Sequence, residues 1–143
     1  MIASLVSTPT TTLLEQTLNF TEQRHNVLLE DIANVDTPGY VQRDVSVEKF
    51  QGALQDAVAK RRASNNDAYQ PKSNSAVNFY AGSSLVQTKP EETVNSVAFH
   101  DRGVRNMEYL MGQVADNAMA HNTVTQLLKS RYDWINKAIS MKP

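Results

Sequence analysis

Apolar residues recur every three or four positions between Leu13 and Asn34. Because an α-helix has about 3.6 residues per turn, this spacing places them along one face of a helix. The face comprises Leu14, Leu18, Thr21, His25, Leu28 and Ile32, and it is widened by Leu13, Phe20 and Val27. The pattern predicts a helix from about Thr12 to Asn34. The Ser/Thr-rich stretch 1–12 that precedes it is predicted to be a flexible arm.

A second and longer helical pattern covers residues 104–143. Its positions keep alternating steps of four and three residues, which is typical of a coiled-coil seam. The positions are Met107, Met111, Val114, Ala118, His121, Thr125, Leu128, Tyr132, Ile135 and Ile139. We define the predicted seam as the larger apolar members of both patterns: Leu14, Leu18, Leu28, Ile32, Met107, Met111, Val114, Leu128, Tyr132, Ile135 and Ile139.

The segment between the two patterns is more polar. Residues 13–62 should contain the first helix, a turn, an extended arm with Val41 and Val45 on one side, and a short helix that Ser46 could cap. Residues 63–103 are predicted to be irregular and partly disordered, with short strands near VNFYAG and SLVQTK. Lys89 to Glu92 resembles a turn or a helix start.

The predicted fold class is mainly α: long N- and C-terminal helices form an antiparallel coiled coil or bundle around a small irregular or short-β middle region. The pairing that we expect sets Leu14 near Ile139. The C-terminal helix is the longer one, so part of its seam should remain for another partner. An apolar stripe that is left uncovered on a monomer indicates assembly.

Residues 33–40 read ANVDTPGY and interrupt the first helical pattern. Pro38 fixes φ and Gly39 accepts a positive φ, which suits the two central positions of a type II turn. Asn34 and Asp36 can hydrogen-bond free backbone groups at the helix end, and Tyr40 can serve as an apolar anchor. The stretch therefore predicts a sharp, specified reversal of the chain.

Composition narrows the possible functions. The net charge of −1 provides no basic field for nucleic acid or anionic lipid, and the absence of cysteine excludes disulfides, thiolate metal sites and a cysteine nucleophile. No stretch approaches the roughly 18 apolar residues that span a bilayer, so we expect no membrane insertion. The N-terminus lacks the basic and apolar regions of a secretory signal peptide.

Little in the sequence suggests catalysis. The chain has three histidines, His25, His100 and His121. The two on helical patterns, His25 and His121, lie too far apart in the expected helix pairing to share a metal ion. Motifs for a zinc protease, a nucleophile elbow or a phosphate-binding loop are missing. We therefore expect no catalytic site, no cofactor and no metal site.

We call residues 33–40 the corner. The corner and its surroundings resemble the axial proteins of the bacterial flagellum, which form the rod, the hook and the hook-associated structures. These proteins typically carry Ala-Asn-x-x-Thr-Pro-Gly-Tyr directly after a long helix, and Asp36 with Arg43-Asp44-Val45 looks most like the proximal rod proteins of the basal body. The segment from Asn122 to Arg131 is similar to their closing helix, whereas the approach from Phe99 to Glu108 departs from the usual pattern. The turn motif that carries the resemblance consists of Ala33, Asn34, Asp36, Thr37, Pro38, Gly39 and Tyr40.

The resemblance implies a non-enzymatic structural subunit of the periplasmic rod, the drive shaft between the motor ring and the hook. It implies export by the flagellar type III apparatus and contacts with other rod subunits, with the adaptor between motor ring and rod, and with further copies of itself. Two alternatives stay open: a sister rod protein, and a secreted helical-bundle interaction module or chaperone that forms no filament.

Overall fold

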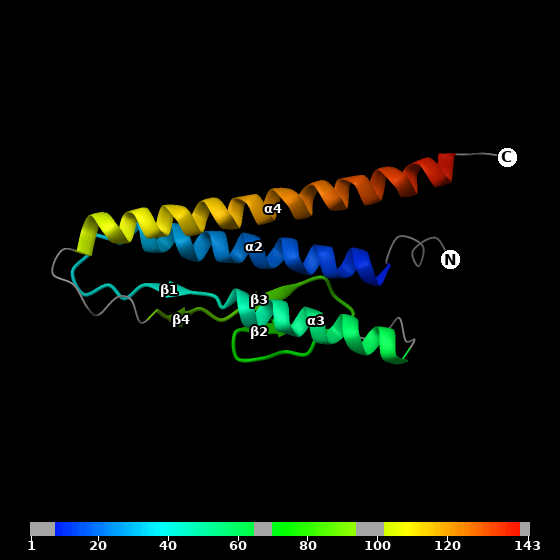
Figure 1. The fold of residues 1–143 in the computed structure, drawn as a ribbon, viewed down its shortest axis with the longest axis horizontal. Coiled ribbons are helices and arrows are strands. Elements are labelled where there is room, and N and C mark those ends of the chain that lie inside the picture. The colour runs from blue at the N-terminus through cyan, green and yellow to red at the C-terminus, as the bar shows by residue number, and fades with distance from the viewer. Residues whose placement is uncertain (1–7, 65–69, 94–101, 141–143) are drawn as a thin grey trace.

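The structure is a computed structural model that describes residues 8–64, 70–93 and 102–140 (Figure 1). Helices account for most of these residues, which confirms the predicted mainly-α class with a short-β middle region. The elements, in chain order, are α2 (Pro9–Ala33), β1 (Arg43–Asp44), α3 (Val47–Ser64), β2 (Val77–Phe79), β3 (Val86–Thr88), β4 (Glu91–Glu92) and α4 (Arg102–Ser140). Residues 1–7, 65–69 and 94–101 of the predicted arm and middle region lie outside the described residues.

The first helix begins earlier than the apolar pattern predicts. Thr8 is its N-cap, its side chain accepts a hydrogen bond from the backbone N–H of Thr11, and Pro9 opens the helix. Proline is well suited to this place because its fixed φ matches the helix and its missing N–H would have had no partner there. Residues 9–12 of the predicted arm therefore belong to α2.

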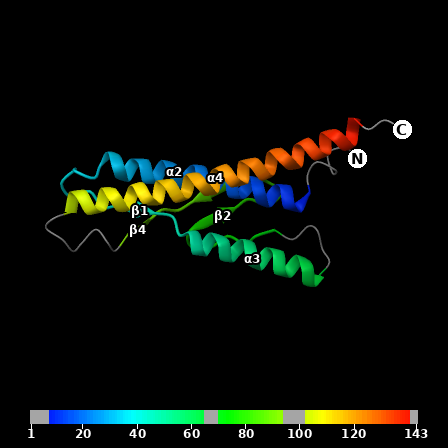
Figure 2. The ribbon, with the colours of Figure 1, turned by 45° about the horizontal axis from the view of Figure 1, so that its top comes forward.

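Helices α2 and α4 lie side by side along most of α2 and run in opposite directions (Figures 1 and 2). Contacts between them fix the register: Arg24 reaches Gln113, Thr21 reaches His121, and Thr8 reaches Arg131. The predicted register, with Leu14 near Ile139, is wrong. Apolar spacing alone allows shifts along the helix, and polar contacts select one of the possible registers.

The face of α4 that packs on α2 is rotated from the predicted one. Leu110, Asn117 and Val124 are buried, whereas Met111 is 52% exposed and Ile139 is 64% exposed. The positions shared by the predicted and the observed face are Met107, Val114, His121, Leu128 and Ile135. Of the seven members of the predicted seam on α4, three are therefore exposed and not buried against α2: Met111, Tyr132 and Ile139.

The middle of the chain forms a second layer on the other side of α2 (Figure 1). Strands β2 and β3 form at the two short apolar runs where strands are predicted, and the structure pairs them antiparallel as a hairpin. Strands β1 and β4 form another small antiparallel pair, with Arg43 opposite Glu92 and Asp44 opposite Glu91. The predicted turn or helix start at Lys89 to Glu92 is wrong, because Glu91 and Glu92 pair with the arm that leaves the corner.

The hydrophobic core lies between α2, α3 and the β2–β3 hairpin. The rings of Phe20 and Phe50 stack with centroids 3.9 Å apart, and Phe79 follows on Phe50 at 5.9 Å. Ser46 caps α3 as predicted, because its hydroxyl accepts from the N–H of Lys49. Val45 is buried in this core, whereas Val41 is 40% exposed, so the predicted shared side of these two valines is wrong.

The side chain of Gln23 ties the hairpin to α2. Its Oε1 accepts from both the backbone N–H and the hydroxyl of Thr88, and its Nε2 donates to the carbonyl of Val86. The amide thus occupies the place that another strand would take along the edge of β3. None of the helices that the structure describes is long and apolar enough to cross a bilayer.

Candidate assembly site

The corner after α2 is a tight turn with the geometry that its sequence predicts. The N–H of Tyr40 donates to the carbonyl of Thr37 at 3.2 Å, and Gly39 has φ of +79°. These values place Pro38 and Gly39 at the central positions of a type II turn. Asn34 ends the helix as expected, because its side-chain Nδ2 and its backbone N–H both donate to the Glu30 carbonyl.

A buried carboxylate holds the two sides of this corner together. Asp31, in the last turn of α2, is 2% exposed. It accepts a 2.8 Å hydrogen bond from the hydroxyl of Tyr40 and bonds of 3.1 and 3.2 Å from the backbone N–H of Arg43. We call these contacts the Asp31 clamp. The clamp fixes where the chain goes after the turn, and the predicted anchor Tyr40 acts in it through its hydroxyl.

The environment of the clamp shifts the pKa values of its members. Burial raises the pKa of Asp31 above its ordinary value of 3.8, although the hydrogen bonds from Tyr40 and from the Arg43 backbone act in the opposite direction. Burial and the bond to Asp31 also raise the pKa of the Tyr40 hydroxyl above 10.0. Tyr40 therefore stays a hydrogen-bond donor to Asp31 at neutral pH.

Arg24 joins α2, the arm and α4 at one point. Its Nε and Nη2 donate to the two carboxylate oxygens of Asp44 at 2.9 and 2.7 Å, and Nη2 also donates to Gln113 on α4 at 2.5 Å. The Arg24 side chain is 9% exposed. Burial by itself lowers the pKa of Arg24, but the hydrogen bonds and charge of Asp44 outweigh this effect and raise it. We call Arg24, Asp44 and Gln113 the Arg24 hub.

Polar side chains also occupy the middle of the contact between α2 and α4. The Nδ2 of Asn117, which is 3% exposed, donates to the Thr21 carbonyl at 2.8 Å. The Thr21 hydroxyl lies 2.8 Å from the Leu18 carbonyl and 3.0 Å from Nδ1 of His121. The Leu18 carbonyl can only accept, so the single hydroxyl hydrogen of Thr21 is donated to it. The bond between Thr21 and His121 must therefore take its hydrogen from Nδ1 of His121, which donates to the Thr21 hydroxyl oxygen. These contacts hold α4 in register on α2.

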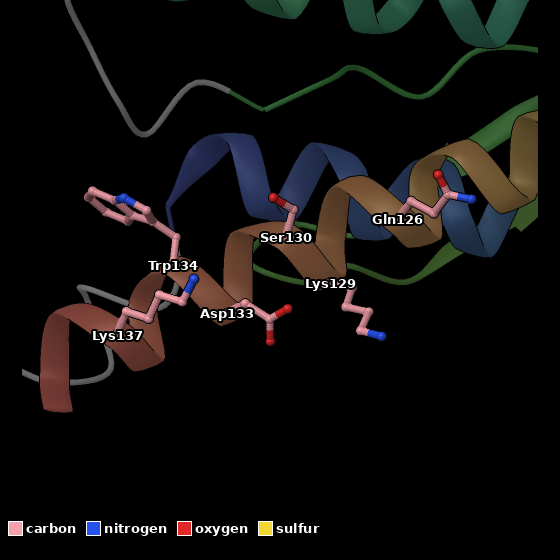
Figure 3. Close-up of a pocket in the computed structure, with 6 residues that line it drawn as sticks. All are labelled: Gln126, Lys129, Ser130, Asp133, Trp134 and Lys137. Atoms are coloured by element: carbon pink, nitrogen blue, oxygen red, sulfur yellow. The ribbon is translucent and has the colours of Figure 1, made fainter.

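The last turns of α4 extend beyond the first residue of α2 (Figure 1). Trp134 and Ile139 are exposed there, and Tyr132 is exposed just before them, where α4 still contacts α2. The hydroxyl of Tyr132 donates to Glu15 at 2.6 Å, and the Arg131 guanidinium lies 5.7 Å from the Trp134 ring. A shallow depression on the outside of this region has Lys129 and Asp133 pointing away from α2 (Figure 3). It is open to solvent and formed by one helix, so it makes no enclosed ligand site.

The structure brings some of the predicted site residues together and separates others. Most of the turn motif is exposed at one end of α2, whereas its members Asn34 and Tyr40 hold the corner in place. Leu28, Leu128 and Ile135 of the predicted seam are buried, and Met111 and Ile139 of that seam are exposed. Whether the exposed members act in assembly stays a prediction.

Sequence reasoning missed the Asp31 clamp and the Arg24 hub as units. Asp31 stands at a position where a helix face would be apolar, and Arg24 follows Thr21 by three residues on the same side of α2. The signal in the sequence was a charged residue at a position that faces inward on a helix. A charge that is buried there requires a partner, so each of these residues indicates a contact with another part of the chain. Their partners lie 9 to 89 residues away and cannot be found by spacing alone.

Other kinds of site find no support in the described residues. Within 8–64, 70–93 and 102–140, no group of three or more His, Asp or Glu residues could hold a metal ion. His100 lies outside these ranges. Comparison of the chain with models of protein families gives no match, and comparison with curated protein sequences gives none either.

Proposed function

We propose that this chain is a structural subunit of the proximal rod in the bacterial flagellar basal body. The observation that carries the proposal is the corner at residues 33–40. Its sequence resembles the motif of flagellar axial proteins, and its type II turn and the Asp31 clamp give the chain a fixed exit from the end of a long helix. A shaft that transmits torque requires such defined geometry between an inner helix and an outer arm.

The two long helices support the same proposal. In the proposed rod subunit, α2 and α4 form an antiparallel coiled coil, and the exposed apolar residues of α4 contact neighbouring subunits. The second layer, with α3 and the two small sheets, would face outward. The proposed location is the periplasmic rod. The proposed partners are other rod subunits, the adaptor between motor ring and rod, and the type III export apparatus.

One observation favours a second candidate, a secreted helical-bundle interaction module or chaperone without a filament. Helices α2 and α4 already pack on each other within one chain, with polar contacts from Thr8 to Arg24 along α2. Light scattering and circular dichroism across concentration separate the two candidates. Helicity that rises with self-association supports the rod subunit, and a fully helical monomer with a sharp melt supports the secreted module.

The decisive experiment replaces the chromosomal gene in the source bacterium. Deletion should abolish rod assembly and motility, and the unaltered gene should restore both. The double change Pro38→Ala and Gly39→Ala should weaken motility and rod assembly more than secretion, because it loosens the corner and leaves the rest of the chain intact. Normal motility in the deletion strain would overturn the proposed function, and normal motility with the double change would overturn the role of the corner.

A further inference from the structure

Five residues of α4 lie at seven-residue intervals beside the face of the helix that packs on α2. They are Met111, Ala118, Thr125, Tyr132 and Ile139, and we call them the second stripe. Met111 is 52%, Tyr132 37% and Ile139 64% exposed. The second stripe spans about 42 Å along the helix axis. A row that keeps a seven-residue spacing over this length stays on one side of a helix that supercoils left-handed around a partner.

The second stripe is continuous with the contact that α4 makes with α2. That contact uses Leu110, Asn117 and Val124, each one residue before a member of the second stripe. Both surfaces border the buried positions Leu128 and Ile135. A helix docked on the second stripe would therefore lie beside the contact with α2 and extend an existing interface.

The helices of the chain itself show which occupant fits. Among the described helices, α3 exposes no large apolar side chain and α2 exposes one, Leu29. With 25 and 18 residues, α2 and α3 are also shorter than the stripe, whereas α4 has 39. In the described part of the chain, the helix that offers a matching apolar row of sufficient length is α4.

We propose that the second stripe binds the second stripe of another copy of this chain, with the two α4 helices antiparallel and a two-fold axis at Thr125. In this register Ala118 of one copy faces Tyr132 of the other, and Met111 faces Ile139. The layer of Ala118 and Tyr132 then combines a small with a large side chain, as dense packing requires. A parallel pair in register would place Ala118 on Ala118 and Tyr132 on Tyr132, leaving a void in one layer and crowding another.

The polar groups of the second stripe are already satisfied inside each copy. The Thr125 hydroxyl donates to the His121 carbonyl at 2.8 Å, and the Tyr132 hydroxyl donates to Glu15 at 2.6 Å. A partner helix therefore meets the methyl group of Thr125 and the ring of Tyr132 without leaving an unpaired donor. The resulting pair uses the same surface on both copies and is closed. This pairing goes beyond the proposed function. A closed pair cannot extend into a rod, so the pairing concerns the chain before it is assembled.

Cysteine cross-linking of the purified full-length chain tests this arrangement, since the chain has no cysteine of its own. Ala118→Cys and Tyr132→Cys chains are mixed and oxidised. The antiparallel pair predicts a mixed disulfide between the two variants, because these positions face each other. It predicts little Ala118→Cys homodimer, because the two copies of that residue lie about 21 Å apart along the axis. Predominant Ala118→Cys homodimer would overturn the antiparallel arrangement.

A matched pair of threonines tests the pairing without cross-linking. Thr125 and Thr123 are both exposed and both bond to the carbonyl four residues earlier, but Thr123 lies off the second stripe. Thr125→Glu places two like charges at the axis, so light scattering should show a monomer at concentrations where the unaltered chain and Thr123→Glu remain dimers. A monomeric unaltered chain, or equal association of the two variants, would overturn the proposal. Because the purified chain is used, neither result depends on the motility test of the rod function.

Discussion

The hydroxyl of Tyr40 donates a 2.8 Å hydrogen bond to the buried carboxylate of Asp31, nine residues earlier in the chain. The same carboxylate accepts from the backbone N–H of Arg43, so one side chain of α2 holds both the turn and the arm that follows it. The shape of the corner thus depends on a residue outside the turn motif.

Asp31→Ala should therefore destabilise the protein by about 2 kcal/mol, because it leaves the Tyr40 hydroxyl and the Arg43 N–H without their acceptor. Tyr40→Phe removes one of the bonds and should cost about 1 kcal/mol. Denaturant unfolding measures both values. Asp36→Ala changes an exposed carboxylate of the same corner and should stay within about 0.5 kcal/mol. An equal effect of Asp31→Ala and Asp36→Ala would contradict the clamp.

The raised pKa of Asp31 predicts a pH dependence of stability. The folded state keeps the Asp31 proton at pH values where the unfolded chain has lost it, so this group's contribution to the free energy of unfolding falls as the pH rises from about 4 through the folded pKa. The stability difference between the unaltered protein and Asp31→Asn should follow that decline. Carbon-13 NMR titration of the carboxyl group gives the pKa directly. Tyr40→Phe should raise it further, because the Tyr40 hydroxyl stabilises the charged form. A measured value at or below 3.8 would contradict the assignment.

The Arg24 hub should be more sensitive than the exposed ion pair beside it. Arg24→Leu leaves the Asp44 carboxylate without its cation and Gln113 without this donor, and should cost about 3 kcal/mol in unfolding experiments. Arg24→Lys should recover part of this loss, because a single ammonium group cannot replace the two-pronged contact with Asp44. Arg43→Leu removes the exposed pair with Glu30 and should change the free energy of unfolding much less than Arg24→Leu does. Comparable losses for Arg24→Leu and Arg43→Leu would argue against the hub.

The sequence predicts those features whose chemistry is local. Pro38 and Gly39 define the turn type by their own backbone preferences, and Ser46 caps α3 three residues before its bonding partner Lys49. The helices of the two ends follow from apolar periodicity in the same way. Such features need no knowledge of the rest of the fold.

The face and register of α4 depend on more than periodicity. Leu110 and Met111 are adjacent and both apolar, so spacing could not decide which of them packs on α2. Asn117 can lie on the observed face because it hydrogen-bonds to the Thr21 carbonyl. A count of apolar positions disfavours this face, since it scores Asn117 as polar. The register error has the same origin, since contacts such as Thr21 with His121 join residues 100 positions apart.

Asn117 should accordingly contribute to stability although it is polar and buried. Asn117→Ala removes its bond to the Thr21 carbonyl and leaves space in the interface, so we expect a loss of about 1 to 2 kcal/mol. Asn122→Ala, an exposed position one and a half turns later on the same helix, is the control and should be nearly neutral. Denaturant unfolding compares the two. If Asn117→Ala were as stable as Asn122→Ala, the polar contact would not hold α4 in place.

The amide of Gln23 gives a local prediction for the second layer. Gln23→Ala removes the acceptor of the Thr88 N–H and the donor to the Val86 carbonyl, so the outer edge of β3 should open more often. Hydrogen exchange at the Thr88 amide should become about tenfold faster, which corresponds to about 1.4 kcal/mol. Gln23→Glu keeps the acceptor and should protect this amide better than alanine does. The exposed Gln51→Ala serves as the control and should leave the exchange at Thr88 unchanged. Unchanged exchange in Gln23→Ala would show that the core contacts of Phe20 and Val86 alone hold the hairpin on α2.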